Sequence, residues 1–188
     1  ALEECHYKGG KDLLSIYCNN NPSTRIFSGK WLALGGSFNL DDAQADTYHG
    51  DVSAIIMENL PFWTQLIRTP DLSVALMNEW ESKIERIARI TIEEDVANIT
   101  GVPSWMMVLL NRVMELKGIS NISEVWPNLE LFVHGGVSFV PYREQYRRIC
   151  PPGMNYLETY NASEGFFGIQ DRLDSDDMLL MLDYGIYY

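Results

Sequence analysis

The sequence predicts an α/β fold built on a mostly parallel, doubly wound sheet. Apolar runs that are typical of buried strands lie at 97–102, 129–133 and 154–160, and helical segments at 105–116 and 141–150 separate them. This alternating order is typical of a parallel sheet. Parallel crossovers need about a dozen residues or more, and both connections are long enough. At 188 residues the chain fits a single domain with a sizeable core.

The first half of the chain gives further elements. A loose helical stripe covers 1–19, and the apolar run 31–34, closed by Gly35-Gly36-Ser37, indicates a strand. The run Val52–Met57 predicts a second strand, after a polar loop that carries Asp41, Asp42 and Asp46.

Two amphipathic or apolar segments predict the principal helices. Met77–Thr91 repeats apolar residues at spacings of three and four, which predicts a helix packed against the core. Ser104 is the expected N-cap of the helix 105–116, and Gly118 is expected to end it.

Composition and charge exclude several classes of function. Hydrophobic residues make up 46% and charged residues 21% of the chain, as in globular proteins. The formal net charge of −12 argues against a nucleic-acid partner, which requires a basic face. Three cysteines without metal-ligand spacing indicate reduced thiols. With no membrane span or signal peptide in the sequence, we expect a cytoplasmic protein.

Both ends of the chain suggest a fragment. Ala1 lies within a helical pattern, and the apolar run 178–188 reads as an unfinished strand or hairpin. We therefore expect residues 1–188 to be one domain taken from a longer protein.

The stretch from Met154 to Gly168 is the strongest candidate for a functional site. Its apolar strand breaks into small and polar residues at Asn161, Ser163 and Glu164, which supply a carboxamide, a hydroxyl and a carboxylate. In open α/β sheets, ligands bind beyond the carboxyl ends of strands. The alternative is an ordinary strand exit, in which such residues serve only to form the turn.

Other chemistries fit the sequence less well. His134-Gly135-Gly136 and the segment around Ser163 resemble parts of an esterase, but every histidine precedes Ser163, whereas that fold requires one after it. No phosphate loop of the Walker type is present, because Trp31 follows Gly29-Lys30. The aspartates of 171–177 lack the glycine and glutamate of a calcium loop.

Two strand ends together remain as a plausible adenylate site. A glycine pair at Gly135 and Gly136 lets a flat ring approach the backbone, because no Cβ intervenes. Tyr160 could stack on that ring, Ser163 could bind a phosphate, and Glu164 could hold Mg²⁺.

These residues resemble motifs of adenylate-forming enzymes. The run Tyr160-Asn161-Ala162-Ser163-Glu164-Gly165 resembles their Tyr-Gly/Ala-Ser-Ser/Thr-Glu nucleotide motif, and 131–138 resembles their adenine segment. The longer run 159–168 is most similar to the Gretchen Hagen three family of auxin-responsive acyl-acid amido synthetases, in a bacterial version. The segment 101–105, which leads into an apolar helix, also fits that family.

The resemblance implies a fold, a reaction and roles for individual residues. It implies the large N-terminal domain of an enzyme that uses ATP and Mg²⁺ to adenylate a carboxylic acid and then passes the acyl group to an amine. The implied nucleotide-binding residues are Gly135, Gly136, Tyr160, Asn161, Ala162 and Ser163. Ser163 and Glu164 would serve catalysis, with Glu164 as the metal ligand. Val102, Ser104, Met107 and Phe166 are candidates for the acyl pocket.

The sequence also departs from the family pattern. The family's Ser/Thr/Gly-rich phosphate loop does not precede Gly35, and its ribose motif and C-terminal domain would follow Tyr188. We therefore expect these 188 residues to lack ligase activity alone. Two alternatives are a coenzyme A ligase of the same superfamily and a binding or scaffold module with a decayed nucleotide site.

Overall fold

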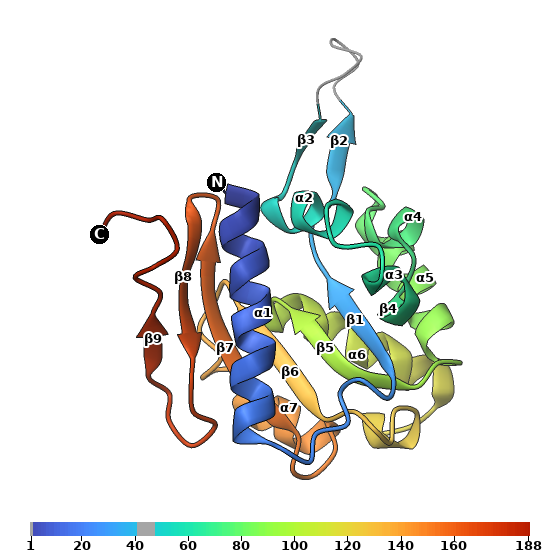
Figure 1. Ribbon diagram of the computed structural model, residues 1–188. Coiled ribbons are helices and arrows are strands. Elements are labelled where there is room, and N and C mark those ends of the chain that lie inside the picture. The colour runs from blue at the N-terminus through green and yellow to red at the C-terminus, as the bar shows by residue number, and fades with distance from the viewer. Residues whose placement is uncertain (1, 41–47) are drawn as a thin grey trace.

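A seven-stranded sheet with helices on both faces forms the body of the protein, as seen in a computed structural model that describes residues 2–40 and 48–188 (Figure 1). The strand order is β4-β1-β5-β6-β7-β8-β9. The strands of the sheet are β1 (Lys30–Leu34), β4 (Arg68–Thr69), β5 (Val96–Gly101), β6 (Leu131–Gly135), β7 (Asn155–Ala162), β8 (Gly165–Gln170) and β9 (Met178–Leu180). The first five in spatial order are parallel, whereas β8 and β9 are antiparallel additions. The parallel core from β5 to β7 confirms the predicted fold class.

A small hairpin and a set of helices complete the fold. The strands β2 (Phe38–Leu40) and β3 (Tyr48–Gly50) pair with each other and project beyond the sheet in Figure 1. The helices are α1 (Leu2–Asn20), α2 (Val52–Glu58), α3 (Thr64–Ile67), α4 (Leu72–Ala75), α5 (Trp80–Thr91), α6 (Pro103–Lys117), the 3-10 turn η1 (Ile122–Glu124) and α7 (Arg143–Ile149). Among the described residues, no helix is both long and apolar enough to cross a membrane.

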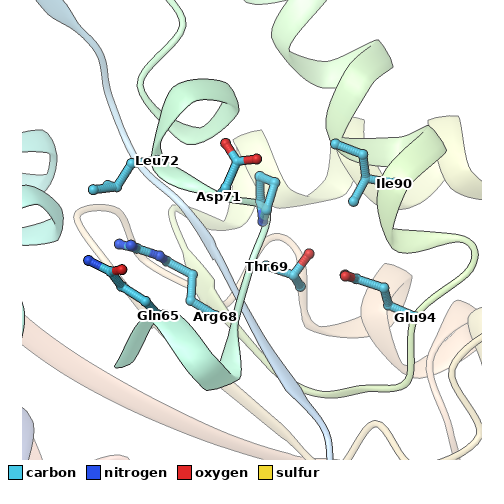
Figure 2. Close-up of a pocket in the computed structure, with 8 residues that line it drawn as sticks. Gln65, Arg68, Thr69, Asp71, Leu72, Ile90 and Glu94 are labelled. Carbon is cyan, nitrogen blue, oxygen red and sulfur yellow. The ribbon is translucent and has the colours of Figure 1, made fainter. Parts of the chain in front are cut away.

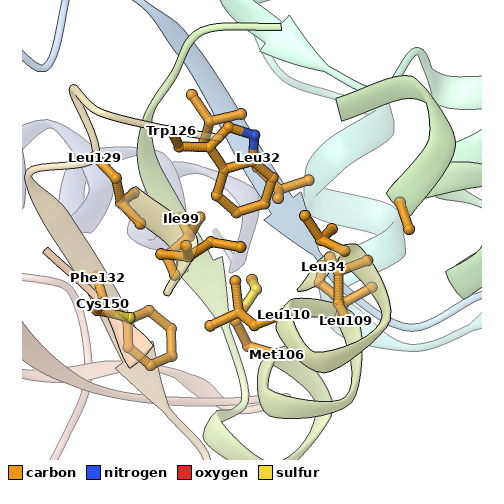
Figure 3. Close-up of a cluster of buried hydrophobic side chains, with 14 of the residues drawn as sticks. Leu32, Leu34, Ile99, Met106, Leu109, Leu110, Trp126, Leu129, Phe132 and Cys150 are labelled. Carbon is orange, nitrogen blue, oxygen red and sulfur yellow. The ribbon is translucent and has the colours of Figure 1, made fainter. Parts of the chain in front are cut away.

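Two hydrophobic clusters occupy the two faces of the sheet. The alternation of β6 shows the division, because Leu131 and Val133 pack toward α1 while Phe132 packs toward the opposite side. On that opposite side, α5, α6 and α7 enclose a larger core that includes Ile99, Met106 and Trp126 (Figure 3). Helix α1 covers the face formed by the second half of the sheet.

The segment Val52–Met57 is a helix, and its prediction as a strand was wrong. Ala54 and Met57, three positions apart, are buried while Ile55 is exposed, so the apolar residues follow a helical period. A short run of adjacent apolar residues does not distinguish these two periods.

The start of α6 also differs from the expectation. The N-cap is Val102 rather than Ser104, and Pro103 takes the first helical position, where its missing N–H costs nothing. Gly118 ends the helix in the left-handed conformation, at φ 66°, as predicted. The polar loop expected around Asp41, Asp42 and Asp46 lies outside the described residues.

Candidate functional site

The two strand ends that the sequence singled out are neighbours in the sheet. Gly101 pairs with His134 across β5 and β6, and Gly135 pairs with Thr159 across β6 and β7. Gly136 and Tyr160 therefore follow at the same carboxyl edge, on strands about 5 Å apart. The sequence alone does not show that these two strand ends are close, because their proximity results from the parallel register.

The two glycines are required for different reasons. A Cβ on Gly135 would lie 2.4 Å from the carbonyl oxygen of Thr159, so any other residue would push β6 away from β7. Gly136 has φ 82°, which residues with a Cβ rarely adopt, and it is exposed. Bare backbone therefore forms the exposed end of β6, next to the start of α6.

The motif around Ser163 is a hairpin rather than the loop that was expected. Asn161 and Ala162 are the last residues of β7, and Ala162 pairs with Gly165 at the start of β8. Ser163 and Glu164 form the two-residue turn and are exposed. The antiparallel strand β8 was not predicted, because its sequence was read only as part of the motif. The hydroxyl and the carboxylate thus stand together at an open tip.

Tyr160 presents its ring beside this hairpin. Its side chain is 57% exposed, and its ring centroid lies 5.2 Å from that of Phe167. A large exposed aromatic ring next to open glycine backbone can stack on a flat ligand ring.

Phe166 does not belong to this surface, so its expected contact with an acyl group is corrected. The side chain is 6% exposed and packs under α1, where a Cβ on Gly9 would lie 2.5 Å from the Phe166 ring. The backbone N–H of Phe166 donates to the Sγ atom of Cys5 at 3.1 Å. Phe166 therefore anchors the hairpin to α1.

The three other candidates for the acyl pocket lie at the beginning of α6. Val102 is nearest to the glycine pair, because its Cγ2 atom is 3.4 Å from where a Gly136 Cβ would stand. Ser104 is half-buried at the second position of the helix. Met107 is partly buried and packs against the larger core. Val102 thus lies at the exposed end of β6.

A second glycine loop shares this edge and was not assigned a role from the sequence. Leu34 pairs with Gly101, so Gly35 and Gly36 follow β1 at the same carboxyl edge. The Nζ atom of Lys83, on α5, donates to the carbonyl oxygens of Gly35 at 2.8 Å and Gly36 at 2.9 Å. The Gly36 N–H donates to the Ser53 hydroxyl at 2.8 Å.

Lys83 is almost completely buried, with 2% of its surface exposed. Burial lowers the pKa of its ammonium group, and the Asp51 carboxylate acts in the opposite direction. A buried lysine is costly unless its donors are satisfied, and here two carbonyl oxygens accept from two of its three N–H groups. The feature of the sequence that could have indicated a buried Lys83 is the position of a lysine on the apolar stripe of a helix.

The residues present can hold Mg²⁺ only together with a ligand. Within the described ranges, no three His, Cys, Asp or Glu side chains cluster at metal-binding distance. Mg²⁺ commonly takes one or two carboxylates and completes its shell with substrate phosphates and water. The exposed carboxylate of Glu164 fits that mode of binding.

A separate pocket of about 380 Å³ lies at the β4 edge, and none of the predicted site residues lines it (Figure 2). The oxygens of Thr69 and Glu94 point into it from opposite sides. The Thr69 hydroxyl and one carboxylate oxygen of Glu94 are buried without a hydrogen-bond partner among the described residues.

The arrangement defines a class of protein. A mostly parallel sheet covered on both faces, with glycine backbone and a Ser-Glu hairpin at one carboxyl edge, is consistent with the N-terminal domain of an adenylate-forming enzyme.

Comparison with known families then identifies the family. The description "GH3 family N-terminal domain" matches residues 2–153, which is most of the chain. The chain therefore belongs to the GH3 family. The matched part includes Gly135 and Gly136 and ends before Tyr160. No curated protein matches the chain.

Proposed function

We propose that the protein is an ATP-dependent acyl-acid amido synthetase. In the proposed reaction, a carboxylate oxygen of the acid attacks the α-phosphorus of ATP and pyrophosphate leaves. An amine nitrogen then attacks the acyl carbon, and AMP leaves as the amide forms. Residues 1–188 would act as one unit of the nucleotide- and acyl-binding domain, in a cytoplasmic enzyme.

The observation that carries this proposal is the register pairing of β6 with β7, in a member of the GH3 family. That pairing sets Gly135 and Gly136 beside Tyr160, so an adenine ring would lie over glycine backbone and against the tyrosine ring. Asn161 and Ala162 would contact its edge.

The Ser163-Glu164 turn would then face the phosphates. The Ser163 hydroxyl would donate to the α-phosphate, and the Glu164 carboxylate would hold Mg²⁺, which supplies charge neutralisation at the phosphorus. No enzyme nucleophile is needed, because positioning and electrostatic stabilisation suffice for such a transfer. Val102, Ser104 and Met107 are proposed to border the acyl group.

Thermal stabilisation by ATP and Mg²⁺ tests the nucleotide site in this chain. A ligand at a hundredfold excess over its Kd stabilises the folded state by about 2.7 kcal/mol. We expect ATP to raise the melting temperature of the chain, and Ser163→Ala and Glu164→Ala to abolish most of the increase. Both side chains are exposed, so the melting temperature without ATP should not change.

Ser120→Ala and Glu124→Ala are matched controls, because these side chains are also exposed. Both controls should keep the full response to ATP. If all four variants respond like the original chain, the nucleotide does not bind at the hairpin.

The reaction is tested by pyrophosphate release in the longest natural chain that contains these residues. Amino acids are then compared with coenzyme A as acceptors. Amide formation supports the proposal, whereas a thioester product would identify a coenzyme A ligase.

A further inference from the structure

An irregularity in strand pairing separates the tip of the β7–β8 hairpin from the rest of the sheet. The register of the two strands shifts between Tyr160 and Asn161. A shift of this kind disrupts the ladder locally and bends the strand pair. The tip, residues 161–166, lies beyond the shift and carries the proposed nucleotide-binding turn at Ser163 and Glu164. Its position therefore depends on contacts from outside the strand pair.

The first turns of α1 supply such contacts (Figure 1). The Sγ atom of Cys5 accepts from the backbone N–H of Phe166 at 3.1 Å, and the Phe166 ring fills the space beside Gly9. At the turn, a Cβ on Gly165 would lie 3.6 Å from the Cys5 Sγ atom and 2.6 Å from the Cδ1 atom of Ile186. Helix α1 thus supports the tip directly.

His6 also faces the tip from α1, and its hydrogen bonds are not satisfied. The side chain is 5% exposed, and neither ring nitrogen makes a hydrogen bond of normal geometry to the described residues. Its ring packs edge-on against Phe166, with the centroids 6.2 Å apart. Burial lowers its pKa, so the imidazole is neutral near pH 7 and carries one N–H. A buried donor without an acceptor is costly, and native structures retain few of them.

The carbonyl of Ala162 is the acceptor within reach of this donor. The Ala162 backbone raises the pKa of His6 against the larger effect of burial, so this carbonyl lies toward the ring. Ala162 is the last residue of β7 and directly precedes Ser163. A small displacement of the tip toward α1 would therefore complete the hydrogen bond and carry the turn with it.

The other buried histidine among the described residues lies elsewhere. His134 stacks on Phe139, with centroids 4.2 Å apart, and is the register partner of Glu158. It packs on the face of the sheet opposite α1. Of these two histidines, His6 is therefore the one that can act on the nucleotide-binding turn.

We propose that His6 is a positioning residue of the nucleotide site. When ATP binds, the His6 imidazole donates to the Ala162 carbonyl oxygen and fixes the Ser163-Glu164 turn against α1. The bond is unmade in the free protein, so its formation adds to the affinity for the nucleotide. This inference rests on the proposed function, because it requires ATP to bind at the turn.

Calorimetric titration of the chain with ATP and Mg²⁺ tests the proposal. We expect His6→Leu to weaken ATP binding about three- to tenfold, which is the contribution of one hydrogen bond. The melting temperature without nucleotide should stay the same or rise, because an unpaired donor leaves the interior. His6→Phe keeps a ring against Phe166 and provides a second variant without the donor.

Two conservative variants test whether the donor itself is responsible. His6→Asn and His6→Gln each carry an amide N–H, near the positions of Nδ1 and Nε2 respectively. At least one of them should restore most of the affinity for ATP. A loss of affinity that is equal in His6→Leu, His6→Asn and His6→Gln would overturn the proposal.

The imidazole N–H gives a spectroscopic readout that a purely structural histidine would not change. The chain has three histidines, so heteronuclear NMR spectra of their side chains are simple, and the His6 signal is the one that His6→Gln lacks. On addition of ATP and Mg²⁺ this signal should move downfield and exchange more slowly with water, because its proton enters a hydrogen bond. An unmoved His6 signal at saturating ATP would contradict the proposal.

Leu13→Ala is the matched control for stability. Leu13 lies on α1 and is buried in the same hydrophobic cluster as Phe166, so its truncation should lower the melting temperature. The affinity for ATP should not change, because the donor of His6 is intact. A loss of affinity in this control equal to that in His6→Leu would overturn the assignment to His6.

Ser163→Ala separates this inference from the proposed function. Weakened ATP binding in Ser163→Ala, together with full affinity in His6→Leu and His6→Phe, would refute the role of His6 and leave the nucleotide site intact. Absence of ATP binding by the original chain would remove both the nucleotide site and the role of His6.

Discussion

Buried and partly buried polar residues differ in how well the fold satisfies their hydrogen bonds. The Glu130 carboxylate accepts hydrogen bonds from the hydroxyls of Tyr17 and Thr24, the amide of Asn21 and the backbone N–H of Arg25. Burial works against its charge, but these donors lower its pKa overall. Glu130 thereby fastens the segment after α1 to the start of β6. The Thr69 hydroxyl, in contrast, is buried with no partner among the described residues.

Thr69→Val should raise the free energy of unfolding. Valine keeps the branched shape and removes a hydroxyl whose desolvation nothing offsets, so we expect a gain of about 1–2 kcal/mol in urea unfolding. Thr91→Val is the matched control, because the buried Thr91 hydroxyl donates to the Ile87 carbonyl oxygen at 2.8 Å. The control should lose stability or remain unchanged. A loss in Thr69→Val as well would show that its hydroxyl has a partner, such as water, in the Figure 2 pocket.

At the scale of the elements, the connection after β1 is held by one side chain from elsewhere in the fold. Lys83 on α5 holds the carbonyls of Gly35 and Gly36, and that loop shares the carboxyl edge with the glycine pair of β6. Loss of its ammonium group leaves two carbonyls without this donor, although the apolar stem still fills the space.

We expect Lys83→Met to lower the free energy of unfolding by about 2–4 kcal/mol, because buried acceptors are left unpaired. We also expect faster hydrogen exchange at the Gly36 amide, measured by NMR, because its bond to the Ser53 hydroxyl depends on the loop position. Lys8→Met provides the comparison, since Lys8 pairs with Asp183 at the surface and should contribute under about 1 kcal/mol. Unchanged Gly36 exchange in Lys83→Met would show that the loop holds its conformation without the lysine.

How well each element could be predicted depended on the number of residues over which its apolar pattern extends. Helix α5 carries its apolar stripe over twelve residues, so its period was evident, although it begins at Trp80 rather than Met77. The run Val52–Met57 is too short for its helical period to be recognised from the sequence, and it was assigned wrongly. The hairpin of β7 and β8 was missed because the residues after Ser163 and Glu164 were interpreted only as part of the nucleotide motif.

At the scale of the whole molecule, the candidate site depends on contacts between distant segments. The sequence indicated Gly135, Gly136 and Tyr160 to Glu164 through their types and their place after apolar runs. It did not indicate Lys83, which acts on residues 47 and 48 positions away. It also placed Phe166 wrongly, because the strand face of that residue is set by pairing with β7 and by α1. The chemical type of each candidate residue could therefore be taken from the sequence, whereas the position of its side chain in the fold could not.

The stability of the molecule should fall as the pH is lowered from 7 to 5. His134 has a folded-state pKa of about 4, against 6.5 in the unfolded chain, so the unfolded state binds more protons in this range. Burial lowers the pKa of His6 as well, with the same sign, whereas the raised pKa of Glu158 acts in the opposite direction. Glu130, with its lowered pKa, contributes loss only below its usual range near 4.5.

His134→Gln separates the contribution of His134 from the others. A pKa difference of one unit corresponds to about 1.4 kcal/mol, so His134 should account for roughly 2 kcal/mol of the loss between pH 7 and pH 5. Urea unfolding of both proteins at the two pH values gives this as a double difference, in which groups that the substitution leaves unchanged cancel. In His6→Gln, the part of the stability loss between pH 7 and pH 5 that comes from His134 should remain. An equal loss in the original chain and in His134→Gln would mean that the imidazole is protonated in the folded state, with its proton held by Glu158 across the strand pair.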